Sequence, residues 1–216
     1  MGYLEDVQVQ TTKRRFVQKQ IIKYLAKYLQ KAESILDVGC GQGDFISQVQ
    51  GRTLLALDLD SQAKNFLPSN VRFINGGIDR LTELEPKSID VIWASNFLEH
   101  LEMEDALIFL NEAHRLIRVS PGSGYLIVMQ PNFKYAYKNY FDDFTHKTIF
   151  TDKSLVSVMR LSGFEVEVCE KRFLPYSLDS KKAKFSFLVG LYLRSKIRIF
   201  SGQMLIVAKP SMESHV

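Results

Sequence analysis

A short segment with glycine at alternate positions constrains this chain more than any other feature. Residues 35–45 read Ile-Leu-Asp-Val-Gly-Cys-Gly-Gln-Gly-Asp-Phe, an apolar run of strand length that passes into a glycine-rich turn. Glycine at positions 39, 41 and 43 permits positive φ and lets a ligand lie against bare backbone, which a Cβ would obstruct. A helix is expected next, with its free N–H groups facing the ligand. The segment predicts a loop that binds a nucleotide cofactor.

Apolar runs of strand length recur along the chain and alternate with helical patterns. The runs are residues 35–38, 54–57, 71–74, 89–94, 125–129, 164–168 and 204–208, and helical stretches are expected at 14–30, 44–50, 61–66, 103–118 and 151–162. Such alternation predicts an α/β fold, a doubly wound parallel sheet covered on both faces. Periodicity alone does not distinguish it from a six-stranded dinucleotide fold. With 216 residues, 46% of them hydrophobic, one domain is expected.

Charge and cysteine content limit the class of protein further. The formal net charge is only +4, but residues 171–200 hold eight Lys or Arg against the single Asp179, so the basic surface is local. Cys40 lies inside the glycine loop, where a disulfide with Cys169 would distort the turn, and a reducing compartment is therefore expected. No targeting segment is evident, and no run approaches the roughly 18 apolar residues of a spanning helix. A soluble, cytoplasmic protein is predicted.

The glycine spacing separates two kinds of cofactor. A dinucleotide fingerprint has the form GxGxxG with a pyrophosphate at the helix N-terminus. Here the third glycine comes one residue early, and Asp44 follows it where a pyrophosphate would be repelled. A zwitterionic ligand with an ammonium and a sulfonium suits this loop better. Asp58, at the end of the second strand, can accept hydrogen bonds from two ribose hydroxyls, although it can also be read as a helix N-cap.

The loop pattern, Asp37 followed by the three glycines, resembles the first motif of the class I S-adenosylmethionine-dependent methyltransferases. The resemblance covers residues 30–170 and implies a Rossmann-like sheet of seven strands, mostly parallel with the last strand antiparallel. It implies S-adenosylmethionine as cofactor, with S-adenosylhomocysteine as product. Gly77 occupies the position at which the family commonly has an Asp that accepts a hydrogen bond from the adenine amino group. Ile78 or Asp79 is therefore expected to contact adenine instead. The implied cofactor contacts are Asp37, Gly39, Cys40, Gly41, Gly43, Asp58, Leu59, Ile78, Asp79, Ser95 and Asn96.

Catalytic candidates are few. Methyl transfer depends mainly on in-line positioning, but a hydroxyl or amine acceptor also benefits from a base. His100 and His146 are the candidates, since histidine titrates near neutrality, and Asp143 could orient His146. Both histidines also have structural interpretations, as a packing or capping residue and as part of a network that holds an insertion. No metal is expected, because adjacent Asp142 and Asp143 seldom converge on one ion and no second histidine is near in sequence.

Two segments are expected on the substrate side, residues 131–150 and 171–202, around a core of 31–130 that follows an N-terminal helix at 1–30. Half of residues 133–144 are aromatic, which suits a pocket wall or a packed lid. Residues 181–200 combine basic and apolar side chains at helical spacing, which suits a helix on the sheet edge or one that contacts an anionic acceptor or a membrane surface. Residues 142–146, 173–177 and 202–205 resemble the bacterial methyltransferase type 11/23 group linked to saccharide or cell-envelope biosynthesis.

These observations predict an S-adenosylmethionine-dependent methyltransferase that acts, at oxygen, on a small-molecule, sugar or lipid-linked acceptor, as a monomer or homodimer. Nucleic acid is a disfavoured partner, because the Asn/Asp-Pro-Pro-aromatic motif of amino-methylating DNA enzymes is absent after the fourth strand. An RNA methyltransferase that uses the basic segment stays open. So does a non-catalytic cofactor-binding partner subunit. A nicotinamide-dependent oxidoreductase is disfavoured by the glycine spacing.

Overall fold

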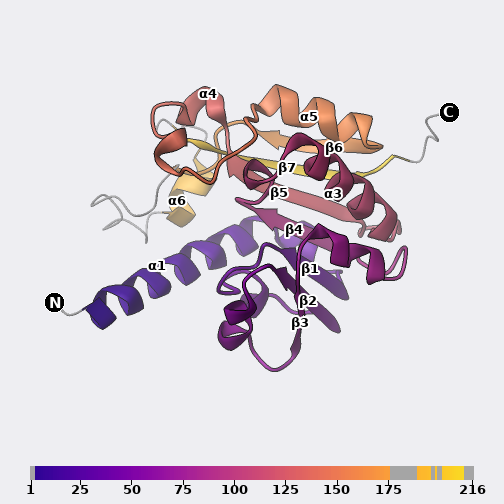
Figure 1. Ribbon diagram of the computed structural model, residues 1–216, viewed down its shortest axis with the longest axis horizontal. Coiled ribbons are helices and arrows are strands. Elements are labelled where there is room, and N and C mark those ends of the chain that lie inside the picture. The colour runs from indigo at the N-terminus through magenta and orange to yellow at the C-terminus, as the bar shows by residue number, and fades with distance from the viewer. Residues whose placement is uncertain (1–2, 176–188, 196–197, 199–200, 212–216) are drawn as a thin grey trace.

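A sheet of seven strands forms the centre of the protein (Figure 1), in the order β3-β2-β1-β4-β5-β7-β6. The computed structural model describes residues 3–175, 189–195, 198 and 201–211. β1 to β5 pair in parallel, whereas β7 runs antiparallel to both β5 and β6. The predicted seven-stranded sheet, mostly parallel with an antiparallel last strand, is confirmed. The strands are β1 Ser34–Val38, β2 Thr53–Asp58, β3 Val71–Asn75, β4 Val91–Ser95, β5 Tyr125–Pro131, β6 Phe164–Glu170 and β7 Gln203–Pro210.

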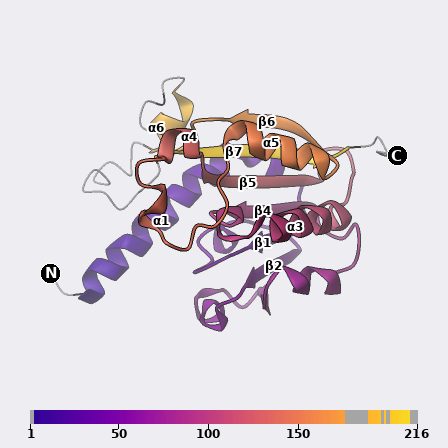
Figure 2. The same ribbon diagram turned by 45° about the horizontal axis from the view of Figure 1, so that its top comes forward.

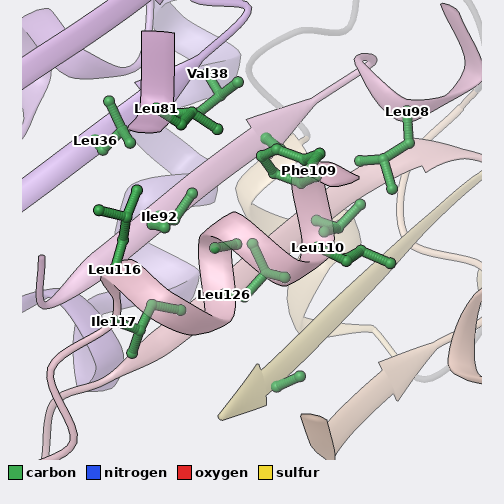
Figure 3. Packing of buried hydrophobic residues seen from close by; sticks show 14 of the residues in the cluster. Leu36, Val38, Leu81, Ile92, Leu98, Phe109, Leu110, Leu116, Ile117 and Leu126 are labelled. Carbon is green, nitrogen blue, oxygen red and sulfur yellow. The ribbon is translucent and has the colours of Figure 1, made fainter. Parts of the chain in front are cut away.

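Helices cover both faces of the sheet, and this is why the central strands read as continuous apolar runs. α3 and α5 pack on one face, and α1, α2 and α6 pack on the other, as Figures 1 and 2 show from two directions. In Figure 3, Phe109 and Leu110 of α3 lie over Ile92 of β4 and Leu126 of β5. The helices are α1 Tyr3–Tyr24, α2 Ala26–Leu29, α3 Met103–Leu116, α4 Phe133–Ala136, α5 Asp152–Leu161 and α6 Val189–Arg194.

The connections after the first strands differ from the prediction. Short 3-10 turns follow β1 and β2, where helices were expected at 44–50 and 61–66, and further 3-10 turns follow β3, β4 and β5. The helices expected at 44–50 and 61–66 are therefore wrong, and among the described residues no long helix follows the glycine loop directly. Too few residues separate Gly43 from Thr53 for an α-helical crossover to the next parallel strand. The turns are η1 Ile46–Gln48, η2 Ser61–Phe66, η3 Ile78–Glu83, η4 Leu98–His100 and η5 Tyr140–Asp142.

Much of the basic segment, residues 181–200, lies outside the described residues. Within it α6 is a short helix whose Val189 and Leu193 are buried against the core. Arg198 pairs with Glu170 at 3.2 Å and lies over the Tyr24 and Phe173 rings. Its guanidinium therefore binds groups of the protein itself rather than an external anion. Among the described residues, no helix combines the length and the apolar character needed to cross a bilayer.

Candidate functional site

The polar ends of the parallel strands meet at one edge of the sheet. The register pairs Val38 of β1 with Leu57 of β2 and with Ala94 of β4, so the segments that follow these strands emerge side by side. β1 also lies where the strand order reverses, since β2 flanks it on one side and β4 on the other. In open α/β sheets, ligands bind in the crevice at such a switch point. The fold therefore places the glycine loop where a cofactor is expected.

The glycine loop takes the backbone conformation that its sequence predicts. Gly39, Gly41 and Gly43 have φ of 68°, 51° and 68°, a region that residues with a Cβ rarely occupy. The N–H of Gly39 donates to the carbonyl oxygen of Leu57 at 2.8 Å, which ties the loop to β2. Asp58 completes the link, because its Oδ2 accepts from the Gly41 N–H at 2.7 Å. Asp58, which is expected to bind the ribose, is therefore hydrogen-bonded to the loop that is expected to bind the rest of the cofactor.

The three glycines of the loop differ in what surrounds them. A Cβ added at Gly41 would meet no atom within 4 Å, so the backbone there faces open space on the ligand side. At Gly39 a Cβ would lie 2.8 Å from the Phe97 ring, and at Gly43 it would lie 2.3 Å from Leu67. Gly41 is therefore the glycine with open space beside it, whereas Gly39 and Gly43 leave room for the protein's own side chains.

Asp37 and Cys40 are the two buried titratable groups of the loop. The pKa of Asp37 is raised to about 8, mainly by burial and in smaller part by the Asp58 and Asp44 carboxylates, whereas a hydrogen bond with the Ile46 backbone lowers it. Asp37 is therefore protonated near neutrality in the folded, ligand-free protein. Burial also raises the pKa of the Cys40 thiol far above its usual range. Cys40 is thus an uncharged loop residue rather than a nucleophile.

The raised pKa of Asp37 predicts a pH dependence of stability. Between about pH 4 and 8 the folded protein holds a proton that the unfolded chain has released, so the free energy of unfolding falls as pH rises. One such group contributes a slope of up to about 1.4 kcal/mol per pH unit. In urea denaturation at pH 5 and pH 7.5, Asp37→Asn should lose less stability than the unmodified protein. Parallel losses in both would contradict the assignment.

Asp44 has partners that the sequence did not reveal. Arg14 and Arg15 of α1 place Nε atoms 3.1 Å and 3.7 Å from its carboxylate oxygens, and Arg14 also donates to Gln42 in the loop. The predicted repulsion of a pyrophosphate by Asp44 is therefore weakened, because two cations offset its charge. The glycine spacing, rather than Asp44, remains the argument against a dinucleotide. No local signal could have indicated this contact, since about thirty positions separate the partners along the chain.

The residues expected at the adenine end lie together after β2 and β3. The Leu59 side chain is 78% exposed, as suits a residue that covers a ligand ring. A Cβ added at Gly77 would lie 2.9 Å from Oδ1 of Asp79 and 3.6 Å from Leu59, so the three residues share one small region. Ile78 begins the η3 turn directly after Gly77. The geometry is consistent with the expected use of Ile78 and Asp79 in place of the missing acid at Gly77.

Ser95 ends β4 on the same edge, and Asn96 follows it. Asn96 takes a φ of 48°, which asparagine tolerates better than most residues, and its N–H donates to the Met129 carbonyl at 2.8 Å. Its Oδ1 accepts from Gln203 of β7 at 3.1 Å. Gln130, near the end of β5, is buried with no hydrogen-bond partner for its amide among the described residues. Neither was predicted as a site residue: Gln203 lies in the segment 202–205 but was given no role there, and Gln130 belongs to no recognisable motif.

His100 and His146 lie side by side, with ring centroids 5.0 Å apart. The absence of a second histidine near His146 in sequence was therefore a misleading argument. His146 is held by the insertion, since its Nδ1 lies 2.6 Å from the Tyr140 carbonyl oxygen. The insertion is in turn tied to η4, because the Lys147 and Thr148 N–H groups donate to the Glu99 carbonyl at 2.8 Å and 3.1 Å. The fold thus unites both predicted base candidates.

Hydrogen bonds assign the tautomers of this pair. A carbonyl oxygen only accepts, so Nδ1 of His146 carries the proton. The Thr145 hydroxyl donates to Asp143 at 2.5 Å and therefore accepts from Nδ1 of His100 at 2.9 Å. Each Nε2 is left with a free lone pair, and burial lowers the pKa of His100, which keeps that ring neutral. Asp143, whose pKa these Thr145 hydrogen bonds lower, orients His100 through Thr145, and its Oδ2 lies 3.9 Å from Nε2 of His146.

Comparison with known proteins gives the family. Residues 9–168 match a family described as methyltransferase domain. The fold is similar to that of a SAM-dependent methyltransferase from Archaeoglobus fulgidus, with a TM-score of 0.68, 20% identity and coverage of 96% of this chain and 100% of that one. It is also similar to a SAM-dependent methyltransferase from Thermotoga maritima, with a TM-score of 0.67, 18% identity and coverage of 96% and 95%. No curated protein matches the sequence. Because the family match spans most of the chain, the protein belongs to the methyltransferase-domain family.

Proposed function

We propose that this protein transfers the methyl group of S-adenosylmethionine to a hydroxyl of a small-molecule, sugar or lipid-linked acceptor. The cofactor is S-adenosylmethionine, in keeping with the family and with the glycine spacing. The observation that carries the proposal is the link from the Gly41 N–H to Asp58 at the switch point, beside open space over Gly41. Asp58 can hold the ribose hydroxyls, and the exposed backbone of the loop can receive the remainder.

The cofactor, when bound, supplies an electrophilic methyl on a good leaving group, so the protein's own residues mainly position the acceptor. The Nε2 atoms of His100 and His146, which carry no proton in these tautomers, are the groups proposed to accept the hydroxyl proton. Both rings lie beyond the end of β4, on the edge that carries the glycine loop. His146, with its Nδ1–H fixed by a backbone carbonyl, is the proposed base.

The acceptor class is supported by the aromatic insertion. Tyr137, Phe141 and Phe144 are 56%, 59% and 93% exposed, although large aromatic side chains are usually buried. Phe141 is braced by edge contacts with Phe133 and Tyr140, and Tyr140 also packs on His146. Exposed, braced rings beside a base suit the apolar face of a sugar or a lipid-linked group.

Methyl incorporation tests the proposal. S-adenosylmethionine labelled in the methyl group is incubated with hydroxyl-bearing acceptors, namely monosaccharides, sugar nucleotides and polyprenyl-linked glycans, and labelled product is counted. On an accepted substrate, His146→Ala should lower kcat by about 10²- to 10⁴-fold, the usual range for loss of a general base. Its cofactor affinity should be unchanged.

His114→Ala is the matched control, because His114 lies on α3 against Phe164, away from the pair. Its kcat should match that of the unmodified protein. Full turnover in both His100→Ala and His146→Ala would overturn the base role and leave positioning alone as the mechanism. Failure to bind S-adenosylmethionine, with tight binding of NAD(H), would overturn the proposed function itself.

A further inference from the structure

Glu99 is a buried carboxylate without a hydrogen-bond donor. Its side chain is 0% exposed, and neither carboxylate oxygen has a hydrogen-bond partner among the described residues. Buried acids are normally paired with a cation or hydrogen-bonded, because an unpaired buried charge is costly. A group left this way in an otherwise well-packed core marks a place where a ligand is missing or a proton is held.

Two further acceptors face the same point. One oxygen of Glu99 and one nitrogen each of His100 and His146 lie within 4.8 Å of one another. The Nδ1–H groups of both rings are engaged, with Thr145 and with the Tyr140 carbonyl, so Nε2 is the nitrogen that each ring has left to offer. One carboxylate oxygen and two imidazole nitrogens this close together can share one cation as its ligands.

We propose that Glu99, His100 and His146 form a binding site for one divalent transition-metal ion, with Zn²⁺ as the representative. Two imidazole nitrogens and one carboxylate oxygen are a ligand set that Zn²⁺ uses in catalytic sites, where a further position stays open. Zn²⁺ fits better than Mg²⁺ or Ca²⁺, which prefer all-oxygen ligands. The site goes beyond the proposed methyl transfer, because cation binding does not depend on the cofactor.

The surroundings of the cluster are those of a supported metal site. Metal-binding histidines usually donate their second ring N–H to a carboxylate, a backbone carbonyl or a water molecule. His146 donates to the Tyr140 carbonyl at 2.6 Å, and His100 donates to Thr145, which Asp143 holds at 2.5 Å. Oδ2 of Asp143 also lies 3.9 Å from Nε2 of His146.

A nitrogen lone pair cannot hold a proton and a metal ion together. In the metal-bound protein the imidazoles would therefore act as ligands, and the cation would lower the pKa of an acceptor hydroxyl in place of the base. That consequence rests on the proposed function, whereas the binding of the cation does not. An experiment can therefore disprove metal binding without disproving methyl transfer, and the reverse also holds.

Metal binding is measured directly on tag-free, EDTA-treated and dialysed protein. Zn²⁺ affinity is obtained by competition with a chromophoric chelator, and Co²⁺ is added in parallel to follow its visible absorption. We expect one tight equivalent of Zn²⁺ per chain and a Co²⁺ spectrum typical of four- or five-coordinate nitrogen and oxygen ligands. His100→Ala, His146→Ala and Glu99→Gln should each weaken Zn²⁺ binding by at least about 100-fold, since each removes a direct ligand and changes beyond the ligands already cost 10- to 100-fold.

His114→Ala provides the matched histidine control, because it removes an imidazole outside the cluster and should keep full affinity. Circular dichroism without metal checks that each variant is folded. His100 is only partly buried, so His100→Ala is the variant that tests the site if the fully buried Glu99 does not tolerate replacement. Absence of a tight equivalent in the unmodified protein, or equal affinity in folded His100→Ala and His114→Ala, would overturn the proposal.

Discussion

Replacing Gly41 with alanine should weaken binding of S-adenosylmethionine by at least about tenfold, equivalent to 1.4 kcal/mol or more. The added Cβ would meet no protein atom within 4 Å, so it would occupy the space that a ligand needs. The φ of 51° also disfavours alanine, at a cost of about 1–2 kcal/mol in stability. Isothermal titration with S-adenosylmethionine measures the affinity, and urea denaturation measures the stability.

Gly122→Ala separates the two effects. Gly122 has a φ of 82° and lies near Lys31, in the turn before β5, so alanine there carries a similar conformational cost without touching the loop. We expect a comparable loss of stability and unchanged cofactor affinity. Equal affinities of the Gly41→Ala and unmodified proteins would show that the ligand does not lie over Gly41, and would remove the main support for the cofactor position.

Asp58→Asn is expected to have the second large effect, a loss of cofactor affinity of about 10- to 100-fold. Hydrogen bonds to a charged group are worth about 1.5–3 kcal/mol, and the substitution removes the charge while keeping the shape. Oδ2 of Asp58 already accepts from Gly41 and Oδ1 from Asp60, so each oxygen retains a lone pair for a ribose hydroxyl. In Asp58→Asn one side-chain oxygen remains as an acceptor, whereas the other is replaced by an NH2 group that cannot accept. Isothermal titration measures the change.

Asp60→Asn is the control for Asp58. Asp60 is an exposed acid two residues away whose side chain caps η2 by accepting from the Gln62 N–H at 2.9 Å. It should bind S-adenosylmethionine as the unmodified protein does. If Asp58→Asn and Asp60→Asn lost affinity equally, the effect would be one of local charge, and the specific contact with the ribose would be disproved.

The strands and the backbone conformation of the glycine loop were predictable because their signals are local. Each strand is an apolar run that the helices cover, so burial is visible in the sequence itself, and all seven predicted runs fall within strands or overlap them. The 3-10 turns were not predictable in the same way. Residues 61–66 satisfy a helical pattern, but packing and the short return to the next strand decided between a helix and a tight turn.

Sequence alone determined the cofactor loop, because alternate glycines and the acid at the end of the second strand act through the backbone nearest to them. Only the tertiary structure decided which side chains surround that loop. Only folding brings Arg14 to Asp44, and only folding unites His100 with His146, which are far apart along the chain, beside a carboxylate without a donor. The charge balance and the acceptor chemistry of the site depend on contacts of this kind, and they arise because parallel strands direct distant segments to the same edge of the sheet.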